Sequence, residues 1–247
     1  MDARLQLRVQ RYGWHAAVAH YHTGREAQLR PAHKLLLEIA RLKPGQRIFE
    51  TTCGSGLFTR RIAEKVGAGG YMLATDLSRD MIDDLQMRIE EDTIATVEAK
   101  RMSAEKLDVS DGVFAAAIGA LGLMYTPDPA AAVAEMTRVV APGGTVAATV
   151  WGEHRNCGWA EVFPIVDARV ASEVCPMFFG AGAPNAFVRL FENTGLTQVE
   201  LLTFKSKVDV VDAVLLGGPV ALAVKRIDED IWQEIRQEFL SSVVEYN

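Results

Sequence analysis

The sequence predicts an α/β fold with a doubly wound, mostly parallel sheet. Strand-like and helix-like segments alternate from residue 46 to residue 151, which is typical of a parallel sheet with helices on both faces. A glycine loop follows the first candidate strand, and an acid follows the second. The expected strands are 48–51, 71–75, 95–100, 113–118 and 145–151, and the expected helices between them are 60–66, 79–91 and 130–140. The Pro-Gly-Gly segment at 142–144 is expected to precede the fifth strand.

The first candidate strand runs into a tight Gly-Ser-Gly turn. Ile48 and Phe49 form a short apolar run that ends at Glu50, and Gly54 and Gly56 follow before an apolar helical stretch. Glycine has no Cβ, so the backbone can turn sharply there and a ligand can approach it closely. An ordinary turn remains the alternative for this glycine pair.

A second acid stands twenty residues past Gly56. Asp76 ends the second strand-like run, where an acid can accept hydrogen bonds from ribose hydroxyls. It could also cap the helix that begins near Ser78, and the two roles are compatible. The glycine loop and Asp76 together predict a cofactor that contains adenosine.

The charge before the glycine loop favours one such cofactor. A dinucleotide site prefers a third glycine where this chain has Thr59, and the Glu50 carboxylate would repel a pyrophosphate. The same carboxylate suits the α-ammonium group of S-adenosylmethionine. We therefore expect S-adenosylmethionine rather than a nicotinamide dinucleotide.

Three segments in order carry a family resemblance: E-x-x-C-G-S-G from residue 50, A-T-D-L-S-R-D-M at 74–81 and V-V-A-P-G-G-T-V at 139–146. Together they resemble class I S-adenosylmethionine-dependent methyltransferases, most closely the ubiquinone/menaquinone-biosynthesis type. The resemblance extends from about residue 12 to about residue 189. It implies a Rossmann-like methyltransferase fold with an N-terminal helical lid (1–42), a cofactor-binding core (43–152), and a substrate-cap insertion, the last core elements and C-terminal helices (153–247).

The resemblance also implies cofactor-binding residues. Ser103 stands where relatives usually have an aspartate near the adenine, and Ala115 replaces another aspartate. From the residues themselves, Glu105 can equally be an exposed charge and Cys53 a small packing residue. The full expected set is Tyr21, Glu50, Thr52, Cys53, Gly54, Gly56, Asp76, Leu77, Met81, Ser103, Ala104, Glu105, Ala120 and Leu121.

Histidines and aromatic residues concentrate near the N-terminus. His15, His20, His22 and His33 lie close together in the sequence. By resemblance this region forms part of a lid over the cofactor. His20 is our candidate for a general base, and surface or packing roles are the alternative for each histidine. No third ligand accompanies a His20/His22 pair, so no metal is expected.

Aromatic residues also follow the fifth candidate strand, where relatives build the acceptor pocket. An apolar lining suits a small aromatic or lipid-like acceptor such as a quinone precursor or natural product, and a core beneath a cap is the alternative. The expected substrate-binding residues are Tyr12, Trp14, Trp151, Trp159 and Phe178. The predicted function is methyl transfer to such an acceptor. The alternatives are a non-catalytic module that binds S-adenosylmethionine or S-adenosylhomocysteine, and a nicotinamide-dependent oxidoreductase.

Composition fits a soluble, cytoplasmic enzyme. The chain has 247 residues, 49% of them apolar, and a formal net charge of −6. The absence of a dense basic tract argues against nucleic-acid binding. No apolar run is long enough for stable membrane insertion, no secretion signal is evident, and the three cysteines read as reduced thiols.

The ends of the chain are expected to be largely helical. Residues 1–42 read as helical with Pro31 near a helix start, and helices are expected at 185–193 and 230–246. A strand is expected at 199–204. No seventh strand is evident, so either the chain is shorter than its relatives or a partner, for which a homodimer is an option, covers that sheet edge.

Overall fold

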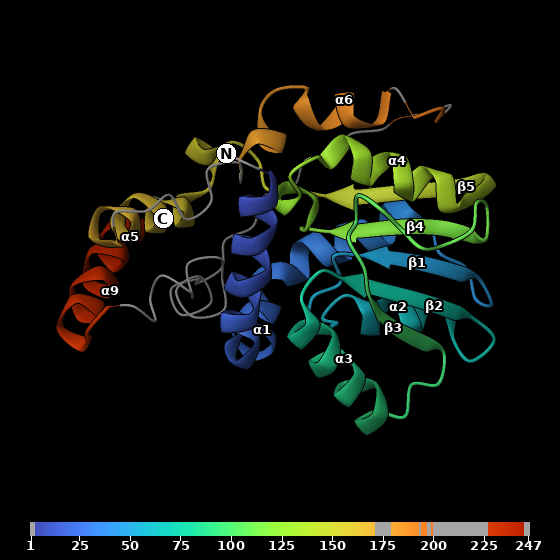
Figure 1. The fold of residues 1–247 in the computed structure, drawn as a ribbon, viewed down its shortest axis with the longest axis horizontal. Coiled ribbons are helices and arrows are strands. Elements are labelled where there is room, and N and C mark those ends of the chain that lie inside the picture. The colour runs from blue at the N-terminus through green and yellow to red at the C-terminus, as the bar shows by residue number, and fades with distance from the viewer. Residues whose placement is uncertain (1–2, 171–178, 193, 197–198, 200–226, 245–247) are drawn as a thin grey trace.

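The computed structural model describes residues 3–170, 179–192, 194–196, 199 and 227–244. Its centre is a five-stranded parallel sheet with strand order β3-β2-β1-β4-β5 (Figure 1). The order reverses beside β1, as expected for a doubly wound sheet. The strands are β1 (Arg47–Thr51), β2 (Tyr71–Asp76), β3 (Val97–Arg101), β4 (Phe114–Ala120) and β5 (Val140–Thr149).

Helices cover both faces of this sheet, because neighbouring strand residues point to opposite sides. Ile48 packs in a buried cluster with α1, α2 and α3, whereas Phe49 packs in a separate cluster with α4 and α6. The predicted α/β class and the predicted strands are therefore confirmed. The helices are α1 (Ala3–Ala40), α2 (Thr59–Val66), α3 (Arg79–Glu91), α4 (Pro129–Val139) and α6 (Ala186–Glu192).

Two expectations about prolines are wrong. Pro31 lies inside α1 rather than near a helix start, although it has no N–H to donate to the Ala27 carbonyl. Ala32, Leu36 and Ala40 are fully or almost fully buried, so tertiary packing keeps the helix continuous past the proline.

The Pro-Gly-Gly segment lies inside β5 instead of before it. The strand begins at Val140, and its pairing with β4 shifts register between Phe114 and Ala116. An added Cβ at Gly144 would lie 2.4 Å from Val140 Cγ1 and 2.6 Å from the Ala115 carbonyl oxygen. The glycine therefore permits a close backbone approach at this irregularity.

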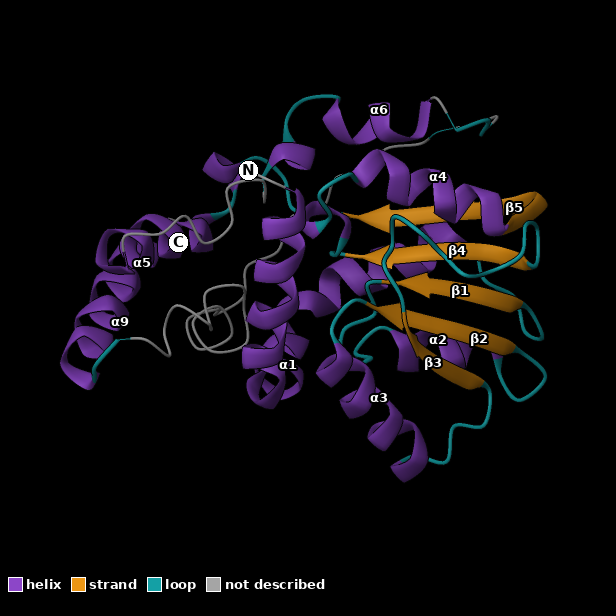
Figure 2. Cartoon of the chain, in the orientation of Figure 1, coloured by secondary structure: helices purple, strands orange, loops and turns teal. Residues whose placement is uncertain are grey.

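The N-terminal part of α1 passes across the carboxyl ends of the strands, and its later part packs over the sheet face (Figures 1 and 2). A second helical region lies beyond α1, where α5 (Val162–Val170) packs on α9 (Glu229–Val244). The expected helices at 185–193 and 230–246 are confirmed as α6 and α9. The expected strand at 199–204 falls almost entirely outside the described residues, and the division at residues 42 and 152 stays a prediction.

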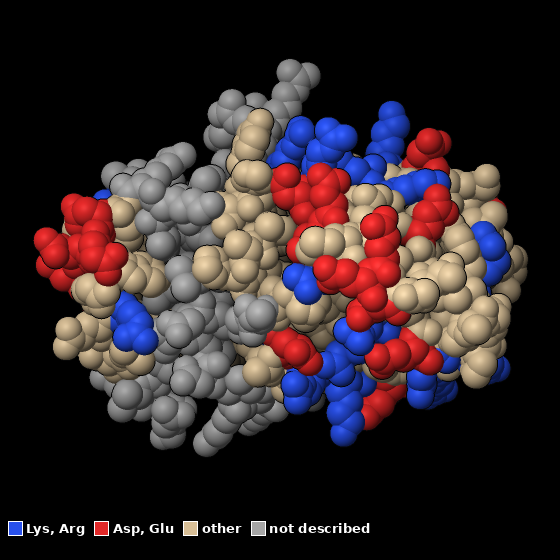
Figure 3. Space-filling view, turned by 90° about the horizontal axis from the view of Figure 1, so that it is seen from below, with Lys and Arg blue, Asp and Glu red and all other residues tan. Residues whose placement is uncertain are grey.

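The described surface is mixed in charge. On the face shown in Figure 3, basic and acidic side chains lie interleaved over the sheet region. Cys53 and Cys157 are free, and Cys175 lies outside the described residues. Among the helices that the structure describes, none combines the length and apolar character required to cross a bilayer.

A pair of glycine substitutions tests the packing behind the glycine loop. Gly56 has a φ of +89°, and an added Cβ would lie 2.4 Å from Leu85 Cδ1. Gly67 shares a positive φ of +65° but has nothing within 4 Å of that position. We expect Gly56→Ala to lower the free energy of unfolding by about 1–3 kcal/mol more than Gly67→Ala, because only the first adds a clash. Urea denaturation of both variants measures the difference, and equal costs would contradict it.

Candidate functional site

A cavity lies between the N-terminal part of α1 and the carboxyl ends of β1, β2 and β4. Its volume is about 80 Å³, smaller than the roughly 300–1,000 Å³ of typical ligand pockets. The Trp14 side chain takes up part of this space. Its ring lies edge-on to those of Tyr21 and Tyr125, with ring centroids 5.6 and 5.0 Å apart. The lining residues are Leu7, Gln10, Arg11, Trp14, Tyr21, Thr52, Gly54, Asp76, Leu77, Ser78, Met81, Met102, Ser103, Ala104, Glu105, Ala120, Leu121, Gly122, Tyr125 and Thr126.

Asp76 holds the glycine loop in place. The Gly54 N–H donates to Asp76 Oδ2 at 2.9 Å, and the Ser78 N–H donates to Oδ1 at 2.8 Å. Burial raises the pKa of Asp76, although the hydrogen bonds from Ser78 and Gly54 oppose that shift. A carboxylate offers about four acceptor positions, so each oxygen keeps capacity for another donor. The helix cap itself is Ser78, whose Oγ accepts the Met81 N–H at 3.4 Å.

Backbone strain gathers at the same place. Thr52 and Leu121 are non-glycine residues with φ of +52° and +54°, and they follow the ends of adjacent strands β1 and β4. An added Cβ on Gly122 would lie 2.0 Å from Thr52 Oγ1, so the two loops touch closely. Such conformations cost about 1–3 kcal/mol each and cluster at binding sites. All three residues line the cavity.

Glu50 lies beneath the cavity wall rather than in it. Its side chain is fully buried, Thr59 Oγ1 donates to Oε2 at 2.6 Å, and Oε1 has no partner among the described residues. Burial raises its pKa to about 8, so the carboxyl is mostly protonated at neutral pH in this state. The expectation of a charged carboxylate facing the mouth of the loop is therefore corrected. The unpartnered Oε1 is nevertheless suited to accept from a cation that reaches it.

Two further expected cofactor residues also lie outside the cavity. Gly56 faces Leu85 of α3, so close packing rather than ligand binding explains why this position requires glycine. Cys53 is buried in the cluster on the α1–α3 face of the sheet, and burial raises the pKa of its thiol. The residues of the expected set that do line the cavity are Tyr21, Thr52, Gly54, Asp76, Leu77, Met81, Ser103, Ala104, Glu105, Ala120 and Leu121.

Comparison with known proteins identifies the fold that carries this cavity. Residues 48–144 match a family model described as a methyltransferase domain. A demethylmenaquinone methyltransferase of Bacillus cereus is 33% identical over 113 residues, 46% of this chain and 48% of that protein. The uncharacterized protein Rv1405c of Mycobacterium tuberculosis is 30% identical over 135 residues, 55% of this chain and 48% of that protein. The matched segment is similar to methyltransferase domains, and these relatives support the predicted class I S-adenosylmethionine-dependent methyltransferase family.

Solved structures extend the likeness of the fold beyond the matched segment. YcgJ of Bacillus subtilis superimposes with a TM-score of 0.59 at 15% identity, covering 83% of this chain and 82% of its own. A Galdieria sulphuraria protein, provisionally named a sarcosine dimethylglycine methyltransferase, has a TM-score of 0.62 at 18% identity and covers 97% and 92%. These structures share the predicted fold, and the matched domain supports S-adenosylmethionine as the cofactor. The chain spans about half the length of the curated relatives it matches.

The residues expected near the adenine line the cavity but already form hydrogen bonds within the protein. Glu105 Oε1 accepts the Asp128 N–H at 2.7 Å, and Ser103 Oγ accepts the Glu105 N–H at 3.4 Å. Sequence reasoning missed Gly122 and Tyr125, which follow β4 on the edge where the binding residues gather. Their position just after a strand of a parallel sheet was the available signal.

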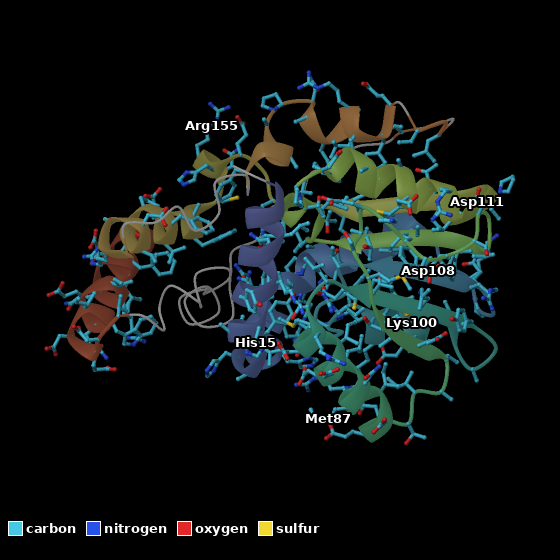
Figure 4. The ribbon with its side chains drawn as sticks, in the orientation of Figure 1. His15, Met87, Lys100, Asp108, Asp111 and Arg155 are labelled. Atoms are coloured by element: carbon cyan, nitrogen blue, oxygen red, sulfur yellow. The ribbon has the colours of Figure 1, made fainter. Side chains whose placement is uncertain are left out.

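The histidines do not supply a base to the cavity. His20 is exposed and outside the lining, so the expectation that it is catalytic has no support in its position. His15 pairs with Asp80 on the side of α1 that faces α3 (Figure 4). His33 is buried against Phe58, and burial lowers its pKa to about 3. Within the described ranges, no group of three His, Cys, Asp or Glu residues is placed to hold a metal.

Most of the expected substrate residues lie elsewhere. Trp14 lines the cavity, whereas Tyr12 is 53% exposed and outside it. The ring centroids of Trp151 and Trp159 are 5.1 Å apart, and both residues pack with Phe163 beside α9 in a cluster that Tyr21 and Tyr125 also contact. Neither tryptophan lines the cavity, so the core alternative fits their positions. Phe178 lies outside the described residues.

The raised pKa of Glu50 predicts a pH-dependent stability. Its folded value of about 8 lies above the unfolded value near 4.3, so the folded state binds the extra proton between them. This contribution is complete below about pH 4 and is lost as pH rises through 8. We expect Glu50→Gln to gain unfolding free energy relative to wild type between roughly pH 5 and 9 in urea titrations.

The matched control is Glu38→Gln, which changes an exposed glutamate on α1. Its difference from wild type should stay constant over the same pH range. A Glu50→Gln profile parallel to that of wild type would contradict the assignment of a buried, protonated carboxyl.

Proposed function

We propose that the chain transfers a methyl group from S-adenosylmethionine to a small, fairly apolar acceptor. The observation that carries this proposal is the Asp76 carboxylate, held by the Gly54 and Ser78 amides at the wall of a cavity that α1 covers. A carboxylate in that position can accept hydrogen bonds from ribose hydroxyls. It also faces the loop against which an adenosyl ligand would pack.

The residues present fit the cofactor at two further points. Glu50 Oε1 is a buried acceptor without a donor, which a methionine ammonium group would satisfy. Gly54 has a φ of +56° and lines the cavity beneath the Tyr21 ring, whose Cε1 would lie 3.3 Å from a Cβ built there. When bound, S-adenosylmethionine supplies a sulfonium whose methyl group is strongly electrophilic. The protein then has to orient the donor and the acceptor and exclude water.

Thr59 supports this cofactor over a dinucleotide. It occupies the position of the third glycine in the dinucleotide motif, is almost fully buried, and donates its hydroxyl hydrogen bond to Glu50. A pyrophosphate would have to approach that carboxyl, whose ionisation it would oppose.

The acceptor end of the cavity favours a nucleophile that is already reactive. Among the described lining residues the carboxyl groups are Asp76 and Glu105, and both accept backbone N–H groups. Burial raises the pKa of Tyr21 to about 12, which makes it a poor base. Alignment therefore carries the acceleration, and the acceptor should lose its proton easily, as an acidic phenol or enol does.

The surrounding aromatic side chains fit a quinone precursor, a natural-product scaffold or a lipid-like molecule. Trp14 and Tyr125 present ring surface to the cavity. Aromatic faces also attract a sulfonium by about 0.5–2 kcal/mol, depending on desolvation.

Isothermal titration with S-adenosylmethionine, S-adenosylhomocysteine and NADH tests the proposal first. We expect binding of both adenosyl ligands and none of NADH, followed by product formation in an acceptor screen weighted toward ionisable phenols and enols. Tight adenosyl binding without turnover on any acceptor would favour a non-catalytic binding module. Binding of NADH alone would favour an oxidoreductase.

Replacement of Asp76 tests directly whether its carboxylate at the cavity wall binds the cofactor. Asp76→Ala removes the carboxylate that accepts hydrogen bonds from the Gly54 and Ser78 amides. It also removes the acceptor of the hydrogen bonds expected from the ribose. We expect S-adenosylhomocysteine binding to weaken by about 1–3 kcal/mol in calorimetry. Asp108→Ala, at an exposed position outside the cavity (Figure 4), is the control and should bind as wild type does. Unchanged affinity in a folded Asp76→Ala variant would refute the role of Asp76.

A further inference from the structure

The Trp14 side chain fills space in the cavity that a ligand needs. Trp14 lines the cavity, whose volume of about 80 Å³ is below that of typical small-molecule sites. Its indole makes T-shaped contacts with the rings of Tyr21 and Tyr125, at interplanar angles of 90° and 83°. Both tyrosines line the same cavity. An aromatic ring of the protein itself therefore lies in the aromatic part of the site.

This ring lies on the side of the cavity away from the residues expected to bind adenosine. In the sheet, β2 and β3 lie on one side of β1, and β4 lies on the other. Asp76 ends β2 and Ser103 follows β3, whereas Tyr125 follows β4. Because the Trp14 ring contacts Tyr125, it occupies the β4 side. With adenosine at Asp76, that side is left for the acceptor.

One hydrogen bond orients the indole in this place. The Trp14 Nε1–H donates to Gln10 Oε1 at 3.2 Å, about one helical turn away on α1. Gln10 lines the same cavity and is 6% exposed. Loss of a hydrogen bond to a buried polar group is costly. A ring that takes the place of Trp14 restores this hydrogen bond only if it brings a donor of its own.

We propose that the Trp14 indole occupies the acceptor's place in the ligand-free protein, and that the acceptor which displaces it is a planar aromatic molecule with an O–H or N–H donor. Tyr21 and Tyr125 then hold the acceptor ring by T-shaped contacts, and Gln10 Oε1 accepts its hydrogen bond. Trp14 is only partly buried, so its ring has a route to solvent. The proposal rests on the proposed function in one respect: methyl transfer makes the occupant of this side an acceptor. It narrows that acceptor, because a lipid-like chain has neither the ring nor the donor.

Removal of the indole tests the proposal without any methyl donor. Trp14→Ala should leave a cavity that binds free indole, as engineered apolar cavities bind aromatic ligands of matching size. Benzofuran is the comparison probe, because it has nearly the same shape but carries an oxygen in place of the N–H. In calorimetry we expect Trp14→Ala to bind indole about fivefold or more tightly than benzofuran, since only indole restores the hydrogen bond to Gln10. Adding Gln10→Leu to this variant should make the two affinities equal.

Fluorine NMR of the wild-type chain supplies a second readout that does not depend on the folding of Trp14→Ala. The chain has four tryptophans, and after labelling with 5-fluorotryptophan the resonance missing from Trp14→Phe belongs to Trp14. Saturating indole should shift that resonance, because the probe displaces the ring, and benzofuran at the same concentration should shift it less. Tyr12→Ala is the matched control, because Tyr12 lies on the same helix but is exposed and outside the cavity. It should respond to both probes as wild type does.

The outcomes separate this proposal from the proposed function. If folded Trp14→Ala binds neither probe and indole leaves the Trp14 resonance of wild type unmoved, the indole only packs the helix and the proposal is wrong. Equal binding of indole and benzofuran by Trp14→Ala would overturn the requirement for a donor.

S-adenosylhomocysteine, added to the indole complex of Trp14→Ala, decides which ligand uses this place. We expect both to bind together. If S-adenosylhomocysteine displaces indole, the place belongs to the cofactor and its assignment to the acceptor is wrong. If S-adenosylhomocysteine binds neither wild type nor the variant, the proposed function fails, and the two probes still decide whether an aromatic donor is bound beside Gln10.

Discussion

The hydrogen bond between the Gly54 amide and the Asp76 carboxylate ties together the two strands on which the site is built. It works only because β1 and β2 pair in parallel with Thr51 opposite Thr75, which brings the two strand ends to the same level. The Cys53 N–H adds a bond to the Thr75 carbonyl at 3.0 Å, and Thr75 Oγ1 donates to the Glu50 carbonyl at 3.1 Å. A slip of one residue would turn Asp76 away from the loop. The register of the sheet and the geometry of the site are therefore the same constraint.

Unfavourable features accumulate around that constraint. Thr52 and Leu121 adopt left-handed backbone conformations, and Glu50 keeps an unpartnered oxygen. The two hydrophobic clusters on the sheet faces supply the stability against which these costs are set. Proteins tolerate local violations of this kind where binding requires them. Two strained residues at the cavity and an unpartnered carboxyl oxygen beneath its wall support a binding role without reference to any motif.

The sequence predicted the features of the fold that depend on local residue patterns, namely the strands and the acid at the end of the second strand. Alternation of apolar segments gave the strands within one to three residues at most boundaries, except for the early start of β5, and the spacing from Gly56 to Asp76 placed the acid at the right strand end. It could not give the features that depend on tertiary packing. Pro31 remains within a helix because Ala32 and Leu36 are buried, and no local signal reports that burial.

Side-chain direction was equally beyond the sequence. Glu50 was expected at the mouth of the loop, but its strand position points it beneath the glycine turn, where the Thr59 hydroxyl donates a hydrogen bond to its Oε2. Trp151 and Trp159 carry the composition of an acceptor pocket yet pack with Phe163 beside α9.

The two ends of α1 are held by different contacts, and these contacts matter for a cavity smaller than typical ligand pockets. Toward its end, Leu36 and Ala40 are part of the core. The N-terminal part is fixed by His15 with Asp80, Glu26 with Arg61 at 3.2 Å, and Trp14 with its two tyrosines. Exposed ion pairs contribute about 0–1 kcal/mol each, so separating them costs little. A ligand whose cationic group satisfies Glu50 would offset that cost, which couples ligand binding to the position of the helix.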